Sequence, residues 1–190
     1  MELASAEKQR LLELARAAVA AAVRQLPLPE ADESALSPAI RAMGASFVTL
    51  RHHGELRGCL GGLEPHEPLY RDVCHHAAQS ATQDHRFTPV TPAEVSDLQI
   101  EVSVLTPPQP LNYTSPADLL QHLRPGVDGV TLELQHRRAT FLPQVWERVP
   151  EPDKFLGMLC EKMGLPADTW RKTKLGVQVY QAEHFSEPEH

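Results

Sequence analysis

The sequence predicts an α+β fold, with a mostly antiparallel sheet packed against helices. Two observations predict it. Longer segments with apolar residues at helical spacing, residues 5–26 and 67–83, occur beside shorter segments rich in strand-forming residues, at 45–51, 56–60 and 98–106. The first two strand segments follow each other directly, and helices do not alternate regularly with strands. This order favours an α+β arrangement over a repeated strand–helix–strand winding.

The first helix is predicted over residues 5–26. Leu11, Leu14 and Ala18 recur at the spacing of one helical face. Pro27 ends the segment, because proline has no backbone N–H and a fixed φ angle. The helix therefore has one apolar side for burial.

A hairpin is predicted next. Residues 45–51 and 56–60 are strand segments, and His52-His53-Gly54-Glu55 between them is a plausible tight turn. Gly54 can adopt a positive φ angle, which such turns require. A helix over 67–83 follows the hairpin.

The second half of the chain begins with its clearest strand, 98–106. Ile100, Val102 and Val104 alternate with polar residues, and prolines from Pro107 onward end the strand. Further helices are predicted at residues 115–123, 153–163 and 166–171, and further strands at 130–134, 139–142 and 177–182.

Size and composition fit one domain over residues 1–190, with frayed ends at 1–7 and 186–190. The formal net charge is −7 with 18 basic residues, so a nucleic-acid partner is not expected. Three cysteines at irregular spacing, without a CxxC pair, argue against a disulfide framework or a structural zinc site. The sequence shows neither a signal-peptide pattern nor an apolar run of about 20 residues. We therefore expect a cytoplasmic protein without a membrane segment.

The segment from Arg57 to Gly61 is the main candidate site. Strict strand alternation places Arg57 and Cys59 on the same face, about 7 Å apart, where a guanidinium can favour a thiolate. Gly58 and Gly61 leave bare backbone, which marks a bulge or the close approach of another backbone or a ligand. This combination suits a small anionic ligand, bound by Arg57, Gly58 and Gly61. The alternative is that Cys59 is a small core residue, as free cysteines often are.

Strand 98–106 offers two more polar candidates. Glu101 and Ser103 lie opposite the apolar face of that strand. If the strand joins the same sheet, Glu101 lies near Arg57 or Cys59 and is a candidate base, or a partner that fixes the guanidinium, while Ser103 is a candidate ligand contact. The alternative is a solvated outer face or a structural ion pair.

A loop cluster follows the helix at 67–83. Asp84-His85-Arg86-Phe87 places a carboxylate, an imidazole and a guanidinium within four residues. His85 is a candidate for proton transfer and Arg86 for ligand binding, because loops on a rigid scaffold often carry sites. The alternative is a helix C-terminal cap.

A metal site is not predicted. His52-His53 and His75-His76 are adjacent pairs, and neighbours on a helix diverge by about 100 degrees. Cys74 beside His75 adds no recognised zinc spacing.

The sequence resembles the AMMECR family, whose bacterial and archaeal members are called AmmeMemoRadiSam system protein A. The family hallmark is a Leu-Arg-Gly-Cys-Ile-Gly hexapeptide, and residues 56–61 depart from it only by Leu60. The resemblance covers residues 8–185. Further matches are Phe47 to Leu50, Asp84 to Phe87, Leu98 to Leu105, Gly126 to Val130, Leu142 to Val145, Lys162 to Leu165, and Trp170.

The resemblance implies an α+β domain with a larger lobe, a smaller lobe and a cleft between them, with the hallmark segment near that cleft. It also implies genes for a Memo-type protein and a radical SAM protein as common companions. It brings no settled enzymatic activity and no known cofactor.

Two functional hypotheses follow. In the first, the chain is an enzyme or enzyme component acting on a small anionic or nucleotide-like substrate, with Arg57 binding the anion and Cys59 as nucleophile. Glu101 or His85 would move protons, and Gln144 would orient the ligand. In the second, the chain is a non-catalytic partner of a Memo-type or radical SAM protein.

Overall fold

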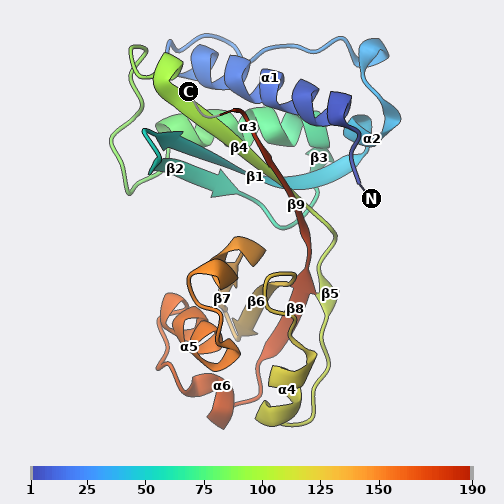
Figure 1. Ribbon diagram of the computed structural model, residues 1–190, viewed down its shortest axis with the longest axis vertical. Helices are drawn as coiled ribbons and strands as arrows, with labels where there is room; N and C mark the ends of the chain where they lie inside the picture. The colour runs from blue at the N-terminus through green and yellow to red at the C-terminus, as the bar shows by residue number, and fades with distance from the viewer. Residues whose placement is uncertain (1, 189–190) are drawn as a thin grey trace. The chain divides into compact units, whose positions relative to one another are not determined.

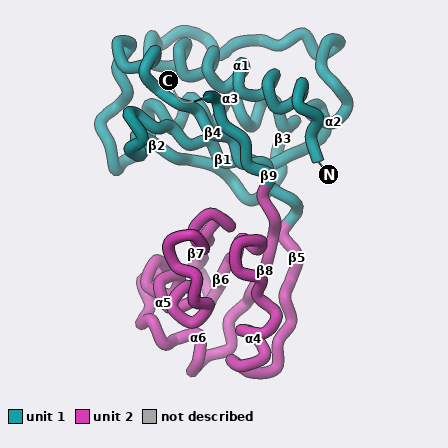
Figure 2. Tube along the Cα trace, in the orientation of Figure 1, with its two compact units in different colours: residues 1–107, 183–190 teal, residues 108–182 magenta. Residues whose placement is uncertain are grey.

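The computed structural model describes residues 2–188, which form two compact units. The first consists of residues 1–107 together with 183–190, and the second of residues 108–182 (Figure 2). In chain order the second unit is thus inserted into the first. Helices and antiparallel strand pairs occur in both units, so the predicted α+β class is confirmed.

The first unit is built on a sheet with strand order β2-β1-β4-β9. Strand β1 (Met43–His52) lies between β2 (Glu55–Gly61) and β4 (Leu98–Leu105) and is antiparallel to both. The predicted hairpin between β1 and β2 is confirmed, with Gly54 at a φ of 80°. The remaining elements of this unit are β3 (Glu67–Pro68), β9 (Ala182–Ser186), η1 (Glu33–Ala35), α2 (Pro38–Arg41) and η2 (Val95–Asp97).

Two helices, α1 (Ser5–Ala22) and α3 (Leu69–Thr82), lie on one face of this sheet (Figure 1). Their apolar stripes, which include Ala15, Ala18 and Ala77, are fully buried. Small side chains at these positions let the helices pack closely. The facing strand residues Val48, Leu50, Ile100 and Val102 complete the core.

The described residues near both ends of the chain, which were expected to be frayed, make specific contacts. Leu3 is buried, and its N–H donates to Glu183 at 3.0 Å. Helix α1 begins at Ser5, within the segment 1–7. At the other end, the Glu187 N–H donates to the Ile100 carbonyl at 3.0 Å, so the chain is anchored at Glu187 as well. Residues 1, 189 and 190 lie outside the described part.

The second unit contains a sheet of order β5-β8-β6-β7, formed by antiparallel pairs. Its core centres on Trp146, whose ring stacks on Phe155 with centroids 3.7 Å apart. The elements are β5 (Gln109–Pro110), α4 (Pro116–His122), β6 (Gly129–Leu134), β7 (Arg137–Phe141), η3 (Pro143–Glu147), α5 (Pro152–Lys162), α6 (Thr169–Lys172) and β8 (Gly176–Tyr180). Across residues 2–188, none of the helices has both the length and the apolar character that a membrane crossing needs.

Candidate functional site

The face of the first sheet opposite α1 and α3 carries polar side chains in a cross-strand row. Thr49 pairs with Cys59 on one side and with Glu101 on the other. Residues directly opposite in neighbouring strands point to the same face, so these three side chains share it. We call the row Cys59–Thr49–Glu101, with Phe47 and Ser103 beside it, the polar face. The register places Glu101 and Cys59 on the same face, two strands apart, with Thr49 between them.

Cys59 is a partly buried free thiol in this row. The Thr49 hydroxyl donates to its sulfur at 3.3 Å. Burial raises the pKa of Cys59 above its ordinary value; the Thr49 hydrogen bond and the positive charge of Arg86 oppose this, whereas Asp84 and Glu101 add to it. Because the net direction is upward, the side chain is a neutral thiol at physiological pH.

A β-bulge decides the position of Arg57. Leu50 pairs with Gly58, and Arg51 pairs with Leu56, so Arg57 is the extra residue between two paired positions. A bulge bends the strand and breaks the strict alternation of side chains. Sequence periodicity alone could not reveal it.

The Arg57 guanidinium is bound to the loop before β4. Its Nε and Nη2 donate to the Glu94 carboxylate at 2.8 and 3.3 Å, and Nη1 donates to the Thr88 carbonyl at 2.7 Å. The side chain is only 15% exposed. Two expectations are therefore wrong: Glu94, not Glu101, fixes Arg57, and Arg86, not Arg57, is the cation that lowers the pKa of Cys59.

Glu101 has its own cationic partner. Arg51 Nε lies 2.5 Å from Glu101 Oε1, and Arg51 Nη1 donates to the Gly54 carbonyl at 3.3 Å. The alternative reading of a structural ion pair thus describes this carboxylate, which remains 15% exposed on the polar face.

The two glycines of the motif are packed against protein atoms. A Cβ on Gly58 would stand 2.2 Å from the Ser80 carbonyl oxygen, on α3. A Cβ on Gly61 would stand 2.4 Å from both the Phe47 ring and the Ser46 carbonyl oxygen. The close approach expected at these glycines is thus an approach of the protein itself, and it leaves no room for a ligand at either side-chain position.

Helix α3 and the turn after it are joined to β2 by polar groups. The Leu60 N–H donates to the Ser80 hydroxyl, and that hydroxyl donates to the Val48 carbonyl, each at 2.8 Å. The Cys59 N–H donates to Asp84 Oδ2, also at 2.8 Å. Asp84 thereby fixes the backbone of the candidate nucleophile, a role that its place in the loop cluster did not indicate.

Asp84 also holds Arg86. Arg86 Nε and Nη2 lie 2.9 and 2.6 Å from its carboxylate, and these hydrogen bonds keep the pKa of Asp84 well below its usual range. Arg86 Nη2 reaches the Cys59 carbonyl at 3.2 Å, while the side chain remains 57% exposed. The neighbouring His85 is exposed.

Two predicted site residues remain, Ser103 at the edge of the polar face and Gln144 in the second unit. Ser103 is buried on β4, with its hydroxyl 3.3 Å from Nδ1 of His184 on β9. Gln144 lies on η3 of the second unit.

Sequence reasoning missed a pair beneath the end of the motif, formed by the buried Asp72 and the partly buried His76. Asp72 Oδ2 accepts from the Ser46 hydroxyl at 2.6 Å and lies 3.1 Å from Nδ1 of His76. The His76 ring lies beside Gly62, where a Cβ would stand 3.5 Å from Cε1. The signal was the spacing of four between Asp72 and His76 on one helix face. A carboxylate at Nδ1 orients an imidazole and leaves Nε2 for other partners.

The fold and the polar face define an α+β protein with a bulged Arg-Gly-Cys edge strand tied to a helix. The chain belongs to the AMMECR1 family, which matches residues 12–185. The resemblance stated from the sequence is thereby confirmed.

Relatives of similar length support this membership. A protein of Methanothermobacter thermautotrophicus is 40% identical over 95% of this chain and 94% of its own. A protein of Thermofilum pendens is 37% identical over 97% of this chain and 92% of its own. The solved structure of the uncharacterized protein PH0010 from Pyrococcus horikoshii superimposes with a TM-score of 0.91 at 31% identity, covering 98% and 94% of the two chains.

Proposed function

We propose that the chain is an enzyme, or an enzyme component, that binds a small anionic or nucleotide-like ligand at the polar face. One observation carries the proposal: a thiol, a hydroxyl and a carboxylate share a cross-strand row at Cys59, Thr49 and Glu101, and an exposed guanidinium adjoins it at the Cys59 carbonyl. Loops and strand faces that combine such groups are where ligands bind.

Arg86 is the cation assigned to the anion. Asp84 occupies the guanidinium edge formed by Nε and Nη2, and a guanidinium has a second edge that carries Nη1. The large exposed fraction of Arg86 supports access to this second edge. Arg57, the cation expected from the sequence, is already bound by Glu94 and two loop carbonyls, at Thr88 and Pro89.

Cys59 is assigned as the nucleophile. Its raised pKa means that it rests as a thiol, so the reaction needs a base to take the proton. The Glu101 carboxylate lies in the same row on the far side of Thr49 and is the base assigned here; the Thr49 hydroxyl takes the thiol proton as it gives its own to Glu101, which leaves a thiolate and a neutral acid. Arg51 then stabilises the carboxylate whenever the proton leaves it again.

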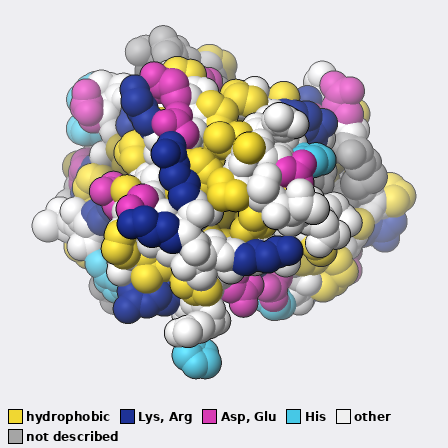
Figure 3. Space-filling view, turned by 90° about the horizontal axis from the view of Figure 1, so that it is seen from below, with side chains coloured by type: hydrophobic (Ala, Val, Ile, Leu, Met, Phe, Trp, Pro, Cys, Tyr) yellow, Lys and Arg dark blue, Asp and Glu magenta, His cyan; other side chains and the backbone are white. Residues whose placement is uncertain are grey.

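The charge distribution supports a small ligand over a nucleic acid. The formal net charge is −7. On the face in Figure 3, Lys and Arg side chains are interspersed with Asp and Glu side chains and hydrophobic ones. Binding of nucleic acid relies on clustered basic residues. The three free thiols support a reducing compartment such as the cytoplasm.

The test is alkylation of the full chain by iodoacetamide near neutral pH, followed by peptide mass spectrometry, with and without inorganic phosphate or AMP as probes. We expect Cys59 to react before the buried Cys74 and Cys160, and a probe that binds to slow that reaction. Arg86→Gln should abolish the protection, whereas the matched change Arg71→Gln, at an exposed ion pair on α3, should not. Labelling of Cys59 no faster than that of the other two cysteines would contradict the proposal.

A second candidate function is docking on a Memo-type or radical SAM protein without catalysis. The raised pKa of Cys59 and the full engagement of Arg57 favour it, because both remove a reactive group from the motif. Leu56, at the start of the motif, is exposed and available to a partner. With purified partner proteins, Leu56→Ser should weaken capture, and Val127→Ser, an equally polar change at an exposed residue of the second unit, should not. If neither the purified Memo-type protein nor the purified radical SAM protein binds the chain, the docking function is contradicted.

A further inference from the structure

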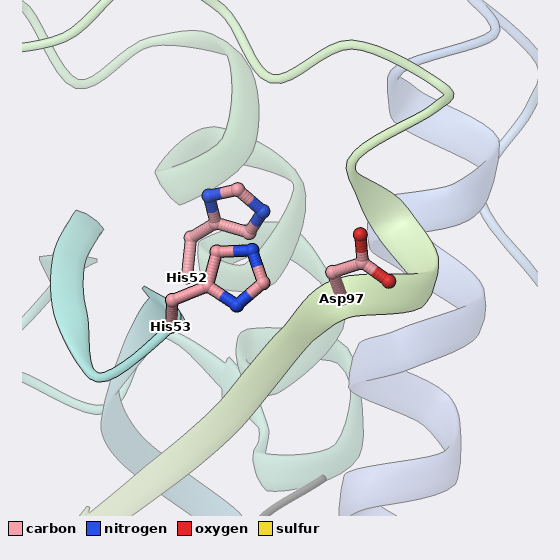
Figure 4. A group of neighbouring side chains, drawn as sticks. All are labelled: His52, His53 and Asp97. Carbon is pink, nitrogen blue, oxygen red and sulfur yellow. The ribbon is translucent and has the colours of Figure 1, made fainter.

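The hairpin turn between β1 and β2 brings two adjacent imidazoles together. His52 pairs with Glu55, and the two residues between them, His53 and Gly54, have φ angles of 52° and 80°. Two left-handed central residues are the mark of a type I′ turn. Consecutive side chains of an extended strand point in opposite directions, but here the ring centroids of His52 and His53 are 4.1 Å apart (Figure 4).

A carboxylate joins the two rings because of the strand register. His52 pairs with Leu98, the first residue of β4, and Asp97 comes immediately before it, at the end of η2. Asp97 thus lies at the same end of the ladder as the turn, and Figure 4 shows it beside the two rings.

The backbone that carries Asp97 is held from α1. Arg16 Nη1 donates to the Val95 carbonyl at 2.9 Å, and Nη2 donates to the Leu98 carbonyl at 2.6 Å. These two hydrogen bonds fix the chain on either side of Asp97. The turn and the carboxylate therefore both stand on well-anchored elements, as a binding site requires.

From this geometry we propose that His52, His53 and Asp97 bind one divalent first-row transition metal ion. One ring nitrogen from each histidine and one carboxylate oxygen all lie within 4.8 Å of one another. Metal–ligand bonds of roughly 2.1 Å in a tetrahedral site need donors about 3.4 Å apart. His53 and Asp97 are exposed, so their side chains can rotate and bring the donor atoms from their present separation to the distance that a bound ion requires.

The donor set selects the class of ion. Two imidazoles with one carboxylate suit Zn²⁺, Ni²⁺, Co²⁺ and Cu²⁺, whereas Mg²⁺ and Ca²⁺ prefer oxygen ligands alone. The exposed position leaves the remaining coordination places to water or to a further ligand. The sequence argument against a metal, that adjacent histidines diverge, applies to helices and not to this turn.

The second adjacent pair provides the matched control. His75 and His76 do lie on a helix, α3, and each has a different carboxylate partner. His75 Nδ1 lies 2.6 Å from Glu67, and His76 Nδ1 lies 3.1 Å from Asp72. This pair also consists of two adjacent histidines, but the two rings are held by different carboxylates and do not face one common point. It should therefore not bind a metal ion as His52 and His53 do.

The experiment is titration calorimetry of the untagged full chain with Ni²⁺, together with the visible spectrum of the Co²⁺ complex. We expect one saturable site, with Co²⁺ d–d bands and no thiolate charge-transfer band. His53→Asn, which keeps a side chain that tolerates the left-handed backbone, should weaken Ni²⁺ binding at least tenfold, and Asp97→Asn should weaken it several-fold. His75→Asn should leave the affinity unchanged.

Three results would overturn the proposal: no saturable Ni²⁺ binding, equal affinity in the parent chain and the His53→Asn variant, or a thiolate band in the Co²⁺ spectrum. Circular dichroism of each variant shows whether it folds. If His53→Asn does not fold, the Ni²⁺ affinity of Asp97→Asn tests the proposal instead. Asp97 is exposed and lies outside the turn, so loss of its carboxylate does not disturb the turn backbone.

Discussion

Gly58 lies against the last turn of α3, where a Cβ at residue 58 would stand 2.2 Å from the Ser80 carbonyl oxygen. The hydroxyl of the same serine bridges β1 and β2 through the Val48 carbonyl and the Leu60 N–H. The glycine of the motif thus permits the helix contact that organises the edge strand.

Gly58→Ala should destabilise the first unit by about 1–3 kcal/mol, since the added methyl meets backbone that cannot move without losing the Ser80 bridge. Hydrogen exchange of β1 amides is the measurement, because both tryptophans, Trp146 and Trp170, lie in the second unit and report on that unit. Gly62→Ala is the control, as its Cβ would meet only the His76 ring at an ordinary 3.5 Å. Equal effects of the two changes would contradict the explanation.

Glu94→Gln should remove an acid-sensitive part of the first unit's stability. The hydrogen bond from Arg57 lowers the pKa of Glu94 from 4.5 to about 2, with help from Thr91. Because the folded pKa is the lower one, this stabilisation is complete above the unfolded pKa and is lost as the pH falls from about 4.5 to about 2. We expect the variant to be less stable at pH 7 by roughly 1–3 kcal/mol and to change less across that window.

The measurement is amide exchange or circular dichroism in urea between pH 2 and pH 7. Glu13→Gln serves as control, since Glu13 forms an exposed ion pair with Arg10 on α1 and should matter little. The hydrogen bonds of Asp84 depress its pKa further, so its contribution persists to lower pH in both proteins.

Glu101→Gln should speed the alkylation of Cys59 in the absence of ligand, because iodoacetamide reacts with the thiolate already present at equilibrium and does not depend on the base that serves the proposed reaction. The charge of Glu101 raises the pKa of the thiol, so its removal increases the thiolate fraction at a given pH. Thr49→Val should act in the opposite direction, because the Thr49 hydroxyl donates to the sulfur. The pH dependence of the iodoacetamide rate, followed for Cys59 by mass spectrometry, gives both shifts. Unchanged profiles would mean that the row is not electrostatically coupled.

Phe155→Ala should lower the free energy of unfolding of the second unit by about 3–5 kcal/mol. Phe155 is fully buried, stacks on Trp146 and meets the Phe141 ring edge-on at 5.3 Å. Tryptophan fluorescence in urea is the direct measurement, because Trp146 is itself in the stack. Met158→Ala, on the same helix but exposed, should shift the midpoint little.

Local signals in the sequence predicted much of the fold. The β1–β2 hairpin was predictable, because the positive φ of Gly54 and the two flanking apolar segments are properties of neighbouring residues. The Ser115 cap of α4 was predictable for the same reason, and its hydroxyl accepts the Asp118 N–H. Helix α1 ends at Ala22 instead of residue 26, since helix boundaries depend on contacts as well as on proline.

Contacts between distant residues explain what the sequence did not predict. The bulge at Arg57 depends on the approach of α3 and on a partner, Glu94, that is 37 positions away. Strand β9 escaped prediction because its Glu183, His184 and Ser186 have no apolar alternation, and it becomes a strand by joining β4. The sequence identified which residues carry reactive or charged groups. Which of these groups contact each other could be learned only from the three-dimensional structure.

The insertion of residues 108–182 between β4 and β9 has a consequence for synthesis. Strand β9, which pairs with the outer edge of β4, emerges from the ribosome only after the whole second unit has been made. Until then the backbone N–H and C=O groups along one edge of β4 have no strand partner. The Arg16 guanidinium also lacks the Glu187 carboxylate that it binds in the complete chain. A nascent chain that stalls within the insertion would expose that edge to strands of other chains, so the order of translation is itself a hazard for aggregation.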